Sequence, residues 1–172
     1  SGTWEKVGAV LVIGGGIAGI QGALDLAESG QKVYLLENSP AIGGNMARLD
    51  KTFPTNDCAM CILSPKIVEC GRHLNIETIT WAGLEEVSGS AGHFTAKIRK
   101  RARFVDLEKC TGCGECVETC PVTVASEFDA TLVERKAIFR PYPQAYPNAF
   151  VINKGLPAPC RNACPAGVNV QG

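Results

Sequence analysis

The pattern of apolar positions at the start of the chain predicts a strand, a helix and a second strand. Residues 8–13 (GAVLVI) form a continuous apolar run, which is typical of a strand buried on both faces of a parallel sheet. Apolar residues then recur at helical spacing from Ile17 to Ser29, and Gly30 is a natural stop for that helix. Residues 32–36 (KVYLL) predict the second strand, which ends at Glu37. Together these elements predict one right-handed βαβ unit.

The remainder of the chain has a weaker pattern. Residues 38–75 contain several prolines and glycines, so we expect them to be mainly loop. Residues 76–80 (IETIT) and 93–99 (HFTAKIR) predict strands, with a Gly/Ser turn at 88–92. A cysteine-rich segment follows from about residue 104 to 126, and later prolines predict an extended, irregular last third.

A glycine fingerprint lies between the first strand and the helix. Gly14, Gly16 and Gly19 form GxGxxG in the context that dinucleotide binding requires. These glycines allow a tight turn, the approach of the backbone to a pyrophosphate, and close packing of helix on strand. Glu37 suits a hydrogen bond to ribose hydroxyls, and its charge disfavours the 2′-phosphate of NADP. The alternative is a glycine-rich turn without a ligand.

Two further glycines bear on the choice of nucleotide. Gly43 and Gly44 follow shortly after Glu37. GxGxxG, a strand-end glutamate and then Gly-Gly resembles the first motif of flavoproteins with two dinucleotide domains, the glutathione-reductase-like group. That resemblance favours FAD over NAD.

Four closely spaced cysteines carry the second chemical signal. They are Cys110, Cys113, Cys116 and Cys120, followed at once by Pro121. This spacing is that of the bacterial-ferredoxin run, which gives three ligands to one [4Fe–4S] centre and usually a fourth to another. Gly112 and Gly114 let the backbone wrap around the sulfur atoms. Structural zinc and disulfides are the alternatives, and the three evenly stepped thiolates suit zinc poorly.

The other cysteines leave alternatives open. Cys58-x2-Cys61 has three interpretations: a redox dithiol, partial ligation of a cluster near the flavin, or two semi-buried thiols in a loop. Cys70 is expected to be a core thiol. Cys160 and Cys164 either complete the two centres begun by the main run or open a further iron–sulfur domain, and the second interpretation is favoured.

Composition narrows the classes of protein. The chain has 172 residues, is 45% apolar, and carries no net charge with a pI near 6.7, which argues against a nucleic-acid partner. Nine cysteines in clusters indicate metal ligation in a reducing compartment, so we expect a cytoplasmic protein. The N-terminus is no signal peptide, and the apolar stretch 7–20 is too short for a membrane span. A basic run at 97–103 is interpreted as a solvated strand face, with an acidic redox partner as the alternative.

Three stretches of the sequence together resemble the A subunit of heterodisulfide reductase and its bacterial relatives. They are VLVIGGGIAGIQGALDLAESGQKVYLLE, IGGNMARLDKTFPTNDCAMCILSPKIVECGRH and VDLEKCTGCGECVETCPV. The resemblance covers about residues 7–150. It implies an FAD-binding, thioredoxin-reductase-like domain interrupted by an inserted ferredoxin module. It also implies a place in complexes that move electrons between flavin and iron–sulfur centres, in some members by flavin-based bifurcation.

The resemblance carries site residues onto this chain. For FAD the matching positions are Gly14, Gly16, Gly19, Glu37, Gly43 and Gly44. For clusters they are Cys110, Cys113, Cys116 and Cys120. The tail PAPCRNACPAGVNVQG instead resembles the start of the iron–sulfur domain of glutamate synthase small subunits, and we expect the chain to be a fragment of a longer flavoprotein.

These observations give one expected architecture and two functional hypotheses. We expect an α/β fold, with a partial Rossmann-like FAD-binding βαβ domain (7–100), an inserted ferredoxin-like iron–sulfur module (104–150) and an irregular tail (151–172). The first hypothesis is an electron-transfer subunit that passes electrons between FAD, [4Fe–4S] clusters and other redox subunits. The second is a non-catalytic electron-carrier or adaptor module without flavin. The catalytic residues are unknown from sequence.

Overall fold

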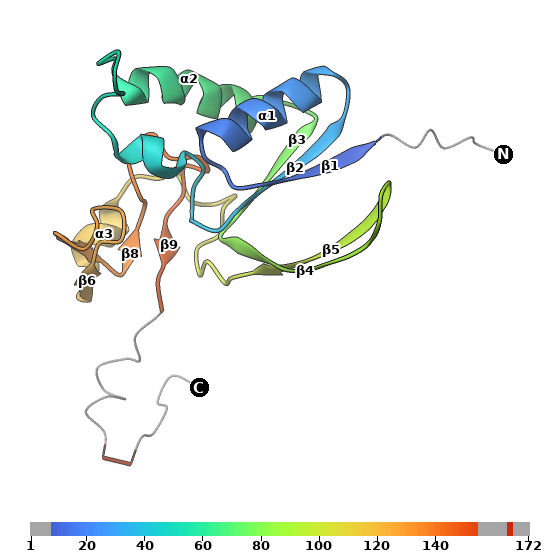
Figure 1. The fold of residues 1–172 in the computed structure, drawn as a ribbon. Coiled ribbons are helices and arrows are strands. Elements are labelled where there is room, and N and C mark those ends of the chain that lie inside the picture. The colour runs from blue at the N-terminus through green and yellow to red at the C-terminus, as the bar shows by residue number, and fades with distance from the viewer. Residues whose placement is uncertain (1–7, 155–164, 167–172) are drawn as a thin grey trace.

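A three-stranded parallel sheet with helices on one face forms the first part of the chain (Figure 1). The computed structural model describes residues 8–154 and 165–166. Strands β1 (Ala9–Ile13), β2 (Lys32–Glu37) and β3 (Ile76–Thr80) pair in the order β1-β2-β3. Helix α1 (Ile17–Glu28) connects β1 to β2, which confirms the predicted βαβ unit and the mixed α/β class.

The helices cover the sheet through their apolar faces. Ile20 and Leu24 of α1 pack with Val33 and Leu35 of β2, and all four side chains are almost fully buried. A fully buried side chain of this size contributes about 1.5–3 kcal/mol of transfer free energy. This packing fixes where α1 begins, directly after the glycine turn.

The expectation of a loop over residues 38–75 is wrong for much of that segment. It contains a 3₁₀ helix η1 (Gly44–Arg48) and a fourteen-residue α-helix α2 (Ala59–Arg72). The apolar residues of α2 that point inward are Ala59, Leu63, Ile67 and Cys70, at helical spacing. Pro65 concealed this pattern, because proline in a helix interior removes a hydrogen bond and is normally a breaker.

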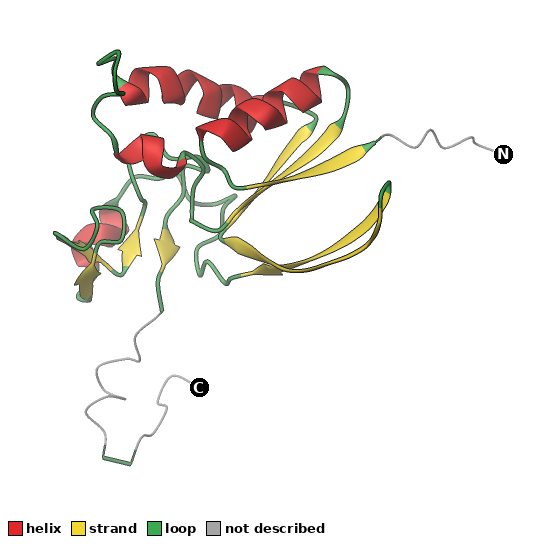
Figure 2. Cartoon of the chain, in the orientation of Figure 1, coloured by secondary structure: helices red, strands yellow, loops and turns green. Residues whose placement is uncertain are grey.

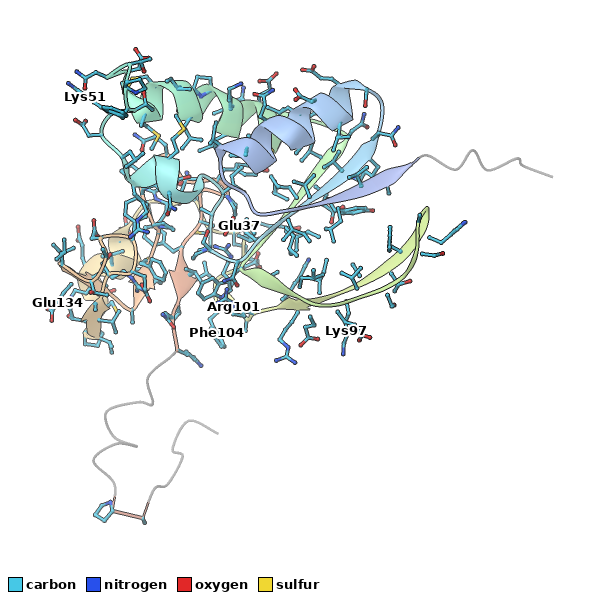
Figure 3. All side chains as sticks on the ribbon, in the orientation of Figure 1. Glu37, Lys51, Lys97, Arg101, Phe104 and Glu134 are labelled. Atoms are coloured by element: carbon cyan, nitrogen blue, oxygen red, sulfur yellow. A yellow bond between two sulfur atoms is a disulfide. The ribbon has the colours of Figure 1, made fainter. Side chains whose placement is uncertain are left out.

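An antiparallel ribbon leaves the parallel sheet after β3. Strands β4 (Ala82–Ser90) and β5 (His93–Lys100) pair along almost their whole length, so the turn is shorter than the predicted 88–92. Lys97 and Arg99 form ion pairs with Glu85 on β4, as expected of a solvated strand face. Figure 3 shows Lys97 on this ribbon, away from the centre of the molecule.

The part of the chain from residue 104 to residue 152 has little regular structure (Figure 2). It contains α3 (Glu115–Thr119) and two short antiparallel pairs. The pairs are β6 (Thr123–Ala125) with β7 (Glu134–Lys136), and β8 (Ile138–Phe139) with β9 (Val151–Ile152). We refer to residues 8–80 as the nucleotide half and to residues 104–152 as the cysteine half.

Two tyrosines of the cysteine half form hydrogen bonds with the nucleotide half. The Tyr142 hydroxyl donates to the carbonyl of Ile42, and the Tyr146 hydroxyl donates to the carbonyl of Gly71 at 2.9 Å. The backbone N–H of Ile42 also donates to the backbone carbonyl of Tyr146, at 3.0 Å. Among the described residues no helix is long and apolar enough to cross a membrane.

Candidate functional site

The three glycines of the fingerprint occupy the turn between β1 and α1 as the motif requires. Gly14 has a φ of +100°, which favours glycine, and its N–H donates to the carbonyl of Leu36 at 2.8 Å. A Cβ on Gly19 would overlap the carbonyl oxygen of Gly14, so this position needs glycine for helix and strand to approach. A Cβ on Gly16 would meet nothing within 4 Å. The space above Gly16 is therefore open to a ligand at the start of α1.

Glu37 ends β2 with its carboxylate directed at this turn. Oε2 accepts the N–H of Gly15 at 2.6 Å, and Oε1 accepts the N–H of Ser39 at 2.7 Å. A carboxylate has about four lone-pair sites, so both oxygens retain acceptor capacity for hydroxyl donors. The strand end thus presents an oriented acceptor beside the glycine turn.

The Gly43-Gly44 pair lies against the glycine turn of the fingerprint. Gly43 and Gly44 have φ of +130° and +58°, and the N–H of Gly43 donates to the carbonyl of Gly15 at 2.6 Å. A Cβ on Gly44 would lie 2.8 Å from the Cα of Gly16. The structure therefore brings the predicted glycines of both motifs together around one turn.

A cavity of about 710 Å³ opens beside Glu37 and reaches the cysteine half. Its walls come from both halves of the chain: Glu37, Ser39 and Gly44 on one side, and Phe128, Phe139 and Tyr142 on the other. Figure 3 shows Glu37, Arg101 and Phe104, which all line this cavity, in the middle of the molecule. Its size is within the range of small-molecule and cofactor sites.

Aromatic and cationic side chains form one wall of the cavity, and of these the sequence analysis singled out only Arg101, as part of the basic run. The Arg101 guanidinium lies 3.9 Å from the ring centroid of Trp81, and the Lys154 ammonium lies 4.1 Å from that of Phe104. Such surfaces suit a planar, electron-rich ring system.

The cysteine run folds around two glycines in the left-handed region. Gly112 and Gly114 have φ of +73° and +93°, and Gly114 is the N-cap of α3. The four thiols are free, with Cys113 exposed and the others half-buried. Desolvation raises the pKa of Cys116, as do the nearby charges of Cys113 and Cys110. Cys110 and Cys113 therefore lie within electrostatic reach of Cys116.

The chemistry of this donor set suits an iron–sulfur cluster, because cysteine thiolates at this spacing are the usual ligands of such clusters. Within residues 8–154 and 165–166, no three His, Cys, Asp or Glu side chains converge on a single-ion site. A four-iron cubane holds its thiolates farther apart than one ion does. A backbone N–H from Ile138 lowers the pKa of Cys120 despite some desolvation, and hydrogen bonds to sulfur are among the features that tune such clusters.

The remaining cysteines have different environments. Cys58 and Cys61 form a disulfide at the start of α2, and disulfide sulfurs lack the thiolate charge that a cluster ligand needs. Cys70 is fully buried, as expected, and burial raises the pKa of its thiol to about 11. The predicted ligands Cys160 and Cys164 lie outside the described residues.

Residues 9–136 match a protein family described as FAD dependent oxidoreductase. Because this match covers well over half of the chain, the chain belongs to that family. The expectation of an α/β fold with a Rossmann-like FAD-binding unit is thereby confirmed.

Curated relatives agree with the resemblance predicted from sequence. The first of two iron-sulfur A subunits of the CoB--CoM heterodisulfide reductase of Methanopyrus kandleri is 58% identical over 149 residues, which are 87% of this chain and 22% of that protein. The A subunit of the H(2):CoB-CoM heterodisulfide,ferredoxin reductase of Methanothermobacter marburgensis is 53% identical over 150 residues, which are 87% of this chain and 23% of that protein. The resemblance to the A subunit of heterodisulfide reductase is confirmed, although the chain spans less than a quarter of the length of either relative.

Proposed function

We propose that this chain is part of an electron-transfer subunit of a heterodisulfide-reductase-like oxidoreductase and passes electrons between FAD and [4Fe–4S] clusters. The nucleotide half would hold FAD, and the cysteine half would be the inserted ferredoxin-like module. Two curated relatives carry reductase subunit names of this kind, and one name includes iron–sulfur. The family to which the chain belongs is described by its dependence on FAD.

The observation that carries the proposal is the shared cavity. Its walls include Glu37 and Gly44 from the nucleotide half and Phe128 and Phe139 from the cysteine half. A nucleotide held at the glycine turn would therefore lie against the segment that follows the cysteine run. Short separation between two redox groups is what electron transfer within one chain requires.

Each group of residues has a defined task in this proposal. Bound FAD would supply two-electron chemistry, and the clusters would supply one-electron steps. The open space above Gly16 admits the pyrophosphate, and the Glu37 carboxylate accepts hydrogen bonds from the ribose. The ligand set proposed for the clusters is Cys110, Cys113, Cys116 and Cys120, with Cys160 and Cys164 as candidates for the remaining positions.

The proposed setting follows from the same chemistry. Other redox subunits would exchange electrons with this chain, and thiolate ligands would persist in the reducing cytoplasm. The proposed domain limits are those expected from the sequence: 7–100 for the FAD-binding part, 104–150 for the iron–sulfur module and 151–172 for the tail.

Cofactor content tests the proposal. Protein purified without oxygen should contain flavin, iron and acid-labile sulfide in fixed ratios to the chain. Iron without flavin would favour an adaptor module, and zinc alone would contradict both hypotheses.

A matched pair of glycine variants makes the test specific to flavin. The Cβ of Gly16→Val would meet only open space, so this variant should preserve the fold and the iron but reduce flavin affinity at least tenfold. Gly22→Ala, which also meets nothing within 4 Å, lies farther along α1 and should keep both cofactors. Equal flavin content in the two variants would contradict the placement of FAD at the glycine turn.

A further inference from the structure

Arg103 is a buried cation at the junction of the two halves. The residue is only 9% exposed. The guanidinium donates to the carbonyl of Pro40 at 2.6 Å and to the hydroxyl of Thr80 at 3.0 Å, both in the nucleotide half. Toward the cysteine half it contacts the carbonyls of Ala149 and Phe150, each at 3.5 Å. One side chain therefore connects three separate segments.

These partners are all neutral. In the described part of the chain no carboxylate forms an ion pair with Arg103, whereas Arg99 and Arg135 are paired with glutamates. Arginine is rarely buried to this extent unless its charge is compensated. Carbonyl dipoles satisfy the hydrogen bonds of Arg103 but leave its full positive charge in place.

A negative charge that acts on Arg103 comes from the cysteine run. The same short segment that receives Arg103 also contacts the glycines of that run. A Cβ on Gly112 would lie 2.8 Å from Oδ1 of Asn148, and one on Gly114 would lie 3.9 Å from the ring of Phe150. Burial lowers the pKa of Arg103, and the charge of Cys110 acts in the opposite direction. The guanidinium thus lies within electrostatic reach of the first cysteine.

We propose that Arg103 is the counter-charge of the iron–sulfur cluster held by Cys110 and raises the reduction potential of that cluster. This inference rests on the proposed function. Reduction adds one electron, and hence one negative charge, to the cluster without requiring a proton. A fixed cation in a poorly solvated position stabilises the reduced form more than the oxidised form. Arg103 would thereby favour reduction of the cluster that Cys110 ligates.

Two pairs of variants test this role by different routes. Arg103→Gln removes the charge and retains donors, while Arg103→Lys retains the charge. Thr80→Asp leaves Arg103 in place and supplies the missing carboxylate beside it, while Thr80→Asn is its uncharged counterpart. Lys109→Gln is the control for a cation that is exposed to solvent. Lys109 adjoins Cys110 in sequence, but its side chain is 86% exposed, so solvent screens its charge.

The readout is an anaerobic redox titration followed by electron paramagnetic resonance, with iron and sulfide counted in every sample. At the wild-type midpoint potential, Arg103→Gln and Thr80→Asp should each lower the ratio of reduced to oxidised cluster about tenfold, which corresponds to 59 mV for one electron. The other three variants should stay within about threefold of wild type. If Arg103→Gln does not fold, the Thr80 pair decides the matter.

The possible failures are distinguishable. Unchanged ratios in cluster-loaded Arg103→Gln or Thr80→Asp would overturn the role of Arg103 and leave the proposed function intact. Wild-type protein without iron would overturn the proposed function, and the role of Arg103 with it.

Discussion

The two halves of this chain are held together by different means. The helices α1 and α2 bury residues along their whole length, and their side chains form one core with β2 and β3. Helix α3 of the cysteine half has no buried residue. Between residues 104 and 136 only Ser126 is buried, and the core is rejoined through Tyr142 and Ala145. The nucleotide half is therefore stabilised by apolar packing, and in the cysteine half the proposed cluster would supply much of the stability, together with the attachments to the core.

The largest expected effect follows from removing that metal centre. Cys113→Ser should abolish iron binding and increase amide hydrogen exchange in residues 110–136 at least a hundredfold, because local stability there depends on the cluster. Exchange in β1, β2 and β3 should remain as in wild type. Cys70→Ala, which removes a buried thiol outside the run, should retain iron. Equal protection in loaded and iron-free protein would contradict the contrast between the halves.

The next effect concerns packing in the nucleotide half. Gly19→Ala places a methyl group against the carbonyl oxygen of Gly14, and we expect a loss of about 1–3 kcal/mol in the free energy of unfolding. Gly22→Ala in the same helix has free space and should change stability by no more than about 1 kcal/mol, in the favourable direction. Denaturant unfolding, followed by the far-UV circular dichroism of the helices, measures the free energy of unfolding of both variants. If Gly19→Ala leaves the free energy of unfolding unchanged, close contact between α1 and β1 is disproved.

A smaller effect depends on pH. The Cys70 thiol has its pKa raised to about 11 by burial, while an unfolded cysteine ionises near about 8.5. Above that lower value the unfolded chain binds fewer protons than the folded one, so the free energy of unfolding falls as pH rises toward 11. The slope from this thiol is at most about 1.4 kcal/mol per pH unit. Cys70→Ala should flatten the measured decline, and an unaltered slope would show that Cys70 ionises freely.

The smallest expected effect concerns the disulfide. Because Cys58 and Cys61 are bonded to each other, replacing both with alanine should leave iron per chain unchanged within about 10%. Iron analysis of the anaerobically purified double variant provides the measurement. A loss of iron would instead support the interpretation that these cysteines ligate a cluster.

The sequence predicted those features that depend on local pattern. The βαβ unit, the glycine turn and the strand-end Glu37 each follow from a few neighbouring residues. Helix α2 was missed because Pro65 masked an apolar spacing that Leu63 and Ile67 otherwise show. The cavity wall of Trp81 and Arg101, and the junction residue Arg103, depend on contacts between distant segments. No local pattern encodes such contacts, and they emerge only when the halves are placed together.

We propose that electrons pass from flavin to cluster within one chain, and light-driven reduction of the flavin tests this transfer most directly. Anaerobic wild-type protein would be illuminated with a sacrificial donor while the absorbance of the iron–sulfur cluster is followed. We predict that the cluster becomes reduced in wild type, and at least tenfold more slowly in iron-loaded Gly16→Val protein that lacks flavin. Equal rates in the two proteins, or an oxidised cluster beside fully reduced flavin, would contradict the account.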